Sequence, residues 1–279
     1  MVKELIMKYK IGFAAQINDE DKIESASVIT APRGTEAVKS VVQIRFPARN
    51  MILAYFNDKF DLRRGDLVYV DGKLEGLRGV VVDVAYNFKI KVSQYQKVIA
   101  LVDTEVHGKF YLAGSHFVTF DREALPKAKA VTWFKAPDKE DDEYVSGSGD
   151  DTSFSLDNLK EMKISPEIAE RGHEYYIENR VRYLSIDGTK GYAIVEGTES
   201  YEVEFTYDAG QISHLICGCF CSYNCKHEFA AMLQLRETLD LIEKNYDSEY
   251  ERSGYFAAIC KGTLFNLAVD GKESGSITL

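Results

Sequence analysis

The chain has no long hydrophobic run. Its longest apolar stretches, such as residues 79–82, are far shorter than the roughly 20 residues that a membrane-spanning helix needs. Residues 1–10 also lack the apolar core of a secretory signal. These two absences predict a cytoplasmic protein that has no membrane partner.

The sequence also lacks the short motifs of several enzyme classes. It contains no Gly-x4-Gly-Lys-Ser/Thr phosphate loop, so these residues cannot by themselves form an ATP-driven motor. No Cys-x-x-Cys redox pair occurs, and the five scattered histidines form no nucleophile–base motif. We therefore predict a protein that is not an enzyme and has no small-molecule substrate.

The 279 residues are numerous enough to build two ordinary domains. Charge is distributed unevenly along them. Residues 1–135 carry 21 Lys and Arg against 16 Asp and Glu, a net charge of +5. Residues 136–279 carry 13 against 28, a net charge of −15. An acidic surface repels a phosphate backbone, so any nucleic acid is expected to bind through residues 1–135.

Composition and periodicity divide the chain into four segments. Residues 1–135 show short β patterns separated by turn residues, which predicts a small β-barrel-like domain. Residues 136–153 are acidic and nearly devoid of apolar side chains, as in a flexible linker. Residues 154–245 are expected to form a second domain, and residues 246–279 a C-terminal β segment. The chain stops inside an apparent strand, which indicates either a terminal hairpin or the front of a longer protein.

Residues 65–82 of the first segment form a strand pair punctuated by glycines. This pattern resembles KOW-type, SH3-like barrels, and the resemblance implies a barrel that contacts RNA or protein. Acidic side chains lie between the basic ones in this region, which favours a structural or protein-binding role.

The second domain is predicted to be α+β. Ser165 is a good helix N-cap and is followed by Pro166 at the first helical position, so a helix is expected to about Asn179. Strand patterns follow, with turns between them that are typical of an antiparallel meander. They cover residues 181–186, 191–197, 200–207 and 212–216. An amphipathic helix is expected after His227, which completes a ββα arrangement.

Four of the five cysteines lie within eleven residues, together with His227. Two pairs of potential ligands, Cys217 with Cys219 and Cys225 with His227, stand at the end of a strand and the start of a helix. Three thiolates and one imidazole are a typical ligand set for structural Zn²⁺. Cys221 is an additional thiol, and a Cys219–Cys221 pair is the alternative that the spacing leaves open.

The pattern Cys-x-Cys, five residues, Cys-x-His resembles the SWIM-type zinc finger, and the similarity extends over residues 165–233. The resemblance implies zinc binding and an interaction with DNA or with a protein. SWIM modules occur in SWI/SNF-type helicases, Mutator-like transposases and assorted bacterial proteins. We therefore expect a protein partner, and an accessory role beside a helicase-type ATPase outside this chain is the alternative. His214, just before the cluster, is predicted to be a half-exposed strand residue.

Overall fold

The structure is a computed structural model that describes residues 38–138, 153–221 and 224–269. It contains two compact units, one built mainly from residues 11–103 and the other from residues 104–134 and 139–279. Each unit has its own sheet and hydrophobic core. The start of the predicted β-barrel-like segment, residues 1–37, and most of the predicted linker, residues 139–152, lie outside the described residues.

The first unit is an antiparallel five-stranded sheet with the order β2-β1-β4-β3-β5. Its strands are β1 (Ser40–Phe46), β2 (Met51–Asn57), β3 (Leu67–Val70), β4 (Gly79–Ala85) and β5 (Val98–Val102), with short 3-10 helices η1 (Pro47–Arg49), η2 (Gly72–Leu74) and η3 (Val92–Gln94) between them. Alternate residues of β1 point into the core.

The barrel predicted for this region is not closed. No continuous ladder joins its two edge strands, β2 and β5. Phe56 of β2 forms only an isolated bridge with Lys97, the residue before β5. The glycine-punctuated pattern therefore belongs to an open five-stranded sheet and not to a closed barrel. Gly79 does serve close packing, because a Cβ atom there would lie 2.3 Å from the Ile44 side chain.

The second unit is an antiparallel eight-stranded sheet with the order β6-β7-β13-β9-β10-β11-β12-β8. The strands are β6 (Tyr111–Ala113), β7 (His116–Thr119), β8 (Phe154–Ser155), β9 (Val181–Asp187), β10 (Lys190–Glu196), β11 (Ser200–Asp208), β12 (Gln211–Cys217) and β13 (Tyr255–Cys260). The helices are α1 (Lys127–Thr132), η4 (Leu159–Met162), α2 (Pro166–Ile177), α3 (Lys226–Ser253), α4 (Lys261–Leu264) and the π-helix η5 (Phe265–Val269).

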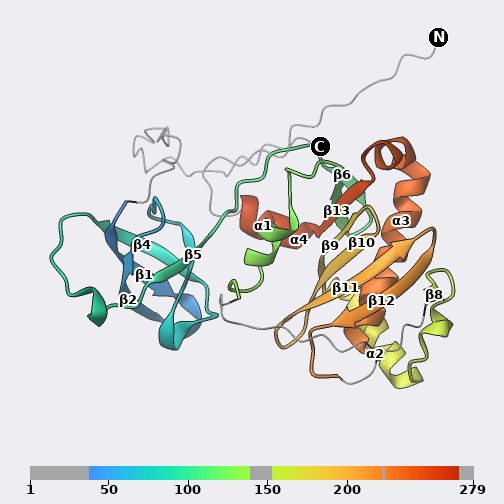
Figure 1. Ribbon diagram of the computed structural model, residues 1–279, viewed down its shortest axis with the longest axis horizontal. Coiled ribbons are helices and arrows are strands. Elements are labelled where there is room, and N and C mark those ends of the chain that lie inside the picture. The colour runs from blue at the N-terminus through green and yellow to red at the C-terminus, as the bar shows by residue number, and fades with distance from the viewer. Residues whose placement is uncertain (1–37, 139–152, 222–223, 270–279) are drawn as a thin grey trace, which may run out of the picture. The chain divides into compact units, whose positions relative to one another are not determined.

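The predicted meander is confirmed as strands β9 to β12, and α3 packs along one face of it (Figure 1). The predicted α2 cap is also present, since the Ile168 amide donates to Ser165 Oγ at 3.3 Å. Buried apolar side chains of the strands and of α3 form a single core. This core fixes the end of β12 against the first turn of α3.

Two regions differ from the sequence-based expectation. Residues 104–134 do not belong with the first sheet, because β7 pairs with β13 and extends the second sheet. The C-terminal β segment predicted for residues 246–279 is helical at residues 261–269, as α4 and η5. The last strand among the described residues, β13, comes earlier and is buried along its whole length between β7 and β9.

None of the helices in the described part of the chain combines the length and apolar content that a membrane span requires.

His116 on β7 supplies a pH-dependent contribution to stability. The side chain is fully buried, with Nε2 2.8 Å from the Val181 carbonyl oxygen and Nδ1 2.9 Å from Ser115 Oγ. Burial lowers the pKa of His116 to about 4, and the bond to Val181 opposes this shift only partly. The unfolded chain therefore takes up the proton first as the pH falls below about 6.5.

We expect His116 to cost the protein up to about 3 kcal/mol of stability between pH 6.5 and pH 4, because the folded state resists protonation there. In His116→Gln, which retains a donor for the Val181 carbonyl, this part of the pH dependence should disappear. Urea unfolding of both proteins from pH 4 to pH 7 measures the difference. Parallel curves for the two proteins would contradict the assignment.

Candidate metal centre

The cysteines and the histidine are supplied by a strand, the loop after it and a helix. Cys217 is the last residue of β12, and Cys219 follows in the loop. Cys225 is the N-cap of α3, and His227 lies in the first turn of that helix. The loop thus brings two pairs of ligand atoms toward one point, as the sequence predicted.

A β-bulge in β12 determines which way the strand's last residues face. In the pairing with β11, Glu204 is opposite Ile216 but Thr206 is opposite Ser213, so β12 has one extra residue between these positions. His214 lies at this point and has a φ of +50°, in the left-handed region. Such a backbone is uncommon for a residue other than glycine, although histidine adopts it more readily than most.

The extra residue changes the side-chain alternation of the strand. Ile212 is fully buried in the core that β12 shares with α3. Strict alternation would place residues 214 and 216 on that same side. Instead, Leu215 and Cys217 pack against the core and Ile216 is exposed. The bulge is therefore the reason that Cys217 faces α3.

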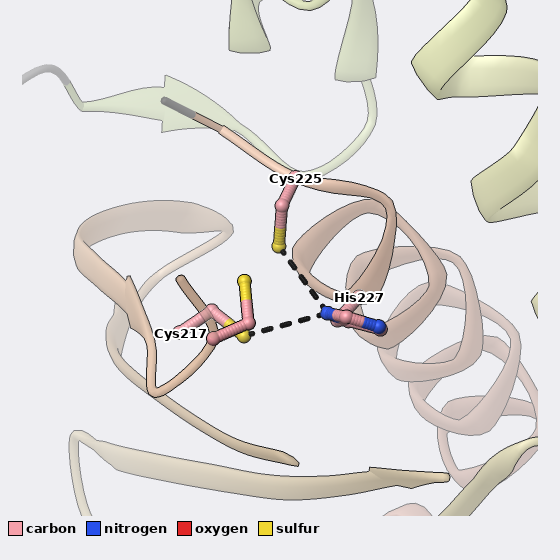
Figure 2. A group of neighbouring side chains, drawn as sticks. Cys217, Cys225 and His227 are labelled. Atoms are coloured by element: carbon pink, nitrogen blue, oxygen red, sulfur yellow. Dashed lines mark hydrogen bonds between the residues drawn. The ribbon is translucent and has the colours of Figure 1, made fainter. Parts of the chain in front are cut away.

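The four ligand atoms of Cys217, Cys219, Cys225 and His227 all lie within 4.8 Å of one another. Figure 2 shows the Cys217 and Cys225 sulfurs directed at the same ring nitrogen of His227, with Nδ1 distances of 3.8 Å and 3.7 Å. Tetrahedral zinc, with its usual bond lengths, would set a sulfur–nitrogen distance of about 3.5 Å. The donor set and its spacing therefore fit a tetrahedral metal ion.

Aromatic rings hold the His227 imidazole in place. Tyr201 on β11 stacks on it with a centroid distance of 4.3 Å, and Tyr175 on α2 approaches at 5.5 Å. Nε2 is buried beside Gly197 and has no hydrogen-bond partner among the described residues. The packing leaves Nδ1 as the nitrogen that is directed at the thiols.

The start of α3 is fixed by a capping box that contains a ligand residue. The Cys225 amide donates to Glu228 Oε2 at 2.7 Å, and the Cys225 side chain accepts from the Glu228 amide. Burial raises the pKa of Glu228, and the bonds from Cys225 oppose that shift. Close packing supports the same turn, since a Cβ atom at Gly172 of α2 would lie 2.9 Å from the Lys226 carbonyl oxygen.

The cluster favours neutral side chains in the absence of a cation. Burial raises the pKa of Cys219 to about 12, and the hydrogen bond with Cys217, followed by burial, raises the pKa of Cys225. Burial, with help from the charges of Lys226 and Arg171, lowers the pKa of His227 to about 4. A bound divalent cation would reverse the preference of the thiols, because a coordinating thiol is deprotonated.

Metal binding should release about three protons per ion at pH 7, because free thiols are ordinarily protonated there and the imidazole is neutral. At pH 6 the number of protons released per ion depends on whether the metal-free protein is folded around His227. The number stays near three if His227 is in a folded site that lowers its pKa. It approaches four if the chain there is unfolded, because an unperturbed imidazole is mostly protonated at this pH and must lose its proton to bind the metal. Zn²⁺ titration calorimetry in buffers of different ionisation enthalpy gives these counts. Release of one proton or fewer would contradict ligation by the thiols.

The other residues considered from the sequence lie outside the group of four. Cys221 is exposed and does not belong to it. His214 is exposed on the opposite side of β12. Tyr201 and Glu228 were not identified as parts of the site. The position of Glu228, three residues after the N-cap, is a usable signal for the capping box, whereas nothing local in the sequence indicates that Tyr201 stacks on His227.

The chain matches no family model, and no solved structure matches it. It is similar to an uncharacterized protein of Methanocaldococcus jannaschii, with 35% identity over 69 residues. That segment is 25% of this chain and 29% of the archaeal protein, so the chain spans less than a third of that relative.

Proposed function

We propose that Cys217, Cys219, Cys225 and His227 bind one zinc ion in a structural site. The convergence of their ligand atoms within 4.8 Å carries this proposal. Soft thiolates with an imidazole favour zinc over hard cations such as Mg²⁺ and Ca²⁺. Four protein ligands also fill a tetrahedron and leave no position for a reactive water, so we assign the ion no catalytic role.

Metal analysis of the purified chain tests the site directly. We expect about one zinc per chain, and X-ray absorption should show three sulfur neighbours and one nitrogen neighbour. A bound water, or only three protein ligands, would show that the position is open and would overturn the structural assignment.

We further propose that the centre belongs to a SWIM-type finger that binds a protein partner. The ligand spacing supports the SWIM assignment, and the net charge of −15 in residues 136–279 disfavours a phosphate backbone. Phe220, between the two ligand pairs, is fully exposed. Exposed aromatic side chains are frequent anchors of protein interfaces.

The variant Phe220→Ala tests partner binding separately from zinc binding. We expect this variant to keep its zinc and its melting temperature but to lose the partner that the wild-type protein retains in a pull-down. Ile177→Ala, at an exposed apolar side chain on α2, is the matched control and should retain the partner. Equal retention by both variants would remove Phe220 from the interface, and identification of an ATPase among the retained proteins would favour the helicase-associated alternative.

A further inference from the structure

The second unit contains a cavity of about 540 Å³ that is separate from the metal centre. It lies on the face of the sheet opposite α3, because its lining residues Tyr183 and Ser185 alternate along β9 with the core residues Leu184 and Ile186. The volume is in the range of known small-molecule sites. No sequence pattern indicated this cavity.

Strand register places the lining residues in two parallel rows across the sheet. One row runs through Ser185, Tyr192, Glu204 and Ile216. The neighbouring row runs through Asp187, Lys190 and Thr206 and continues to Ser213, which does not line the cavity. The first row combines the apolar surface of Tyr192 and Ile216 with the polar Ser185 and Glu204, and the second row is polar throughout.

The segment before α1 borders the cavity and brings two cations to it. Arg122 pairs with Asp187 at 2.7 Å, and Lys127 pairs with Glu204 at 2.8 Å. The Lys127 ammonium also lies 3.8 Å from the centroid of the Tyr192 ring. These cations are therefore compensated by carboxylates that line the same cavity.

Lys190 is the cation of the lining for which the described residues provide no ion pair. It is exposed, and it shares its row with Thr206, which also lines the cavity. A lysine ammonium and a hydroxyl donor together suit a carboxylate or a phosphate oxygen. The polar row therefore offers one uncompensated positive charge to a ligand.

His214 adds a second donor at the end of this row. Simple alternation would direct its side chain into the core, but the bulge and the φ of +50° make it part of the cavity lining instead. This backbone costs about 1–2 kcal/mol for a residue with a Cβ atom. Backbone strain of this kind is often maintained where a side chain has a binding role.

We propose that this cavity binds a small ligand that has a planar, apolar body and one anionic group. The body would lie against Ile216 and beside the Tyr192 ring, one face of which the Lys127 ammonium covers. The carboxylate or phosphate would contact Lys190 and His214. This inference is independent of the zinc assignment, since none of the cavity residues is a metal ligand.

The test is a titration of the full-length, metal-loaded chain with naphthalene probes, followed by ¹H–¹⁵N NMR. Naphthalene-2-carboxylate and 2-naphthyl phosphate distinguish the two anionic groups, and naphthalene-2-carboxamide is the neutral control. We expect saturable shifts confined to β9–β12, the start of β13 and residues 122–127, which together line the cavity. We also expect an affinity at least about tenfold higher for one of the anions than for the carboxamide.

Lys190→Met should remove this preference for an anion, whereas Lys244→Met, on an exposed position of α3, should not change it. His214→Gly should lower the affinity for the anionic probe several-fold. The melting temperature should not fall, because glycine adopts the required backbone conformation without strain. Equal affinity for carboxamide and anions, no saturable shift up to about 5 mM of any probe, or an unchanged preference in Lys190→Met would overturn the proposal.

Discussion

Cys225→Ser should abolish stoichiometric metal binding and lower the melting temperature of the second unit by more than about 10 °C. Cys225 is buried and contributes both a ligand sulfur and the N-cap of α3. A structural zinc site contributes about 10–16 kcal/mol of apparent binding energy, and loss of one ligand forfeits several kcal/mol of it. For a domain of this size each kcal/mol corresponds to about 2–4 °C. Elemental analysis and calorimetry measure the two effects.

Cys221→Ser is the matched control, because it changes the same residue type in the same loop at an exposed position outside the group of four. This variant should keep about one metal ion and its melting temperature. The alternative ligand pair, Cys219 with Cys221, predicts the reverse result, with metal loss in Cys221→Ser. The first unit should be unaffected in both variants, since it has a separate core.

Gly191→Val should destabilise the second unit by about 3 kcal/mol or more, although valine is ordinarily the better strand residue. Gly191 on β10 is directly opposite Phe205 on β11. A Cβ atom at Gly191 would lie 2.0 Å from the buried Phe205 ring, far below a normal carbon–carbon contact of about 3.5–4.0 Å. Urea denaturation followed by circular dichroism measures the change.

A double variant shows whether the clash is the cause. Phe205→Leu in the Gly191→Val background should recover part of the lost stability, because the smaller side chain leaves space for the new methyl groups. Gly262→Ala, at a glycine with open space around its Cβ position, should change stability by less than about 0.5 kcal/mol. If the changes in stability caused by Gly191→Val and Phe205→Leu simply add, the Phe205 ring and the new Cβ atom at position 191 do not compete for the same volume.

The sequence predicts those parts of the fold that depend on local patterns. Ser165 and Pro166 mark the start of α2, and alternating side chains mark β9 to β12. The four site residues were identified because ligand type and spacing are local properties, and the fold brings these residues together. Register between neighbouring strands then follows from short turns.

Non-local pairing explains what the sequence did not indicate. The strands β6 and β7 pair with each other as a local pattern would allow, but the other partner of β7, β13, lies more than a hundred residues away. The segment 263–269 has apolar residues that suit a strand, yet the chain after β13 is already helical there. The bulge at His214 was also missed, since a single extra residue leaves no distinctive composition.

That bulge has a different consequence for each of the two sites on opposite faces of β12. Deleting His214 would restore simple alternation with Leu215 and Cys217 still on the core side and Ile216 still exposed. The metal ligands would therefore keep their orientation, whereas the cavity would lose one of its lining side chains. The extra residue of β12 is thus a part of the cavity and not a requirement of the metal centre.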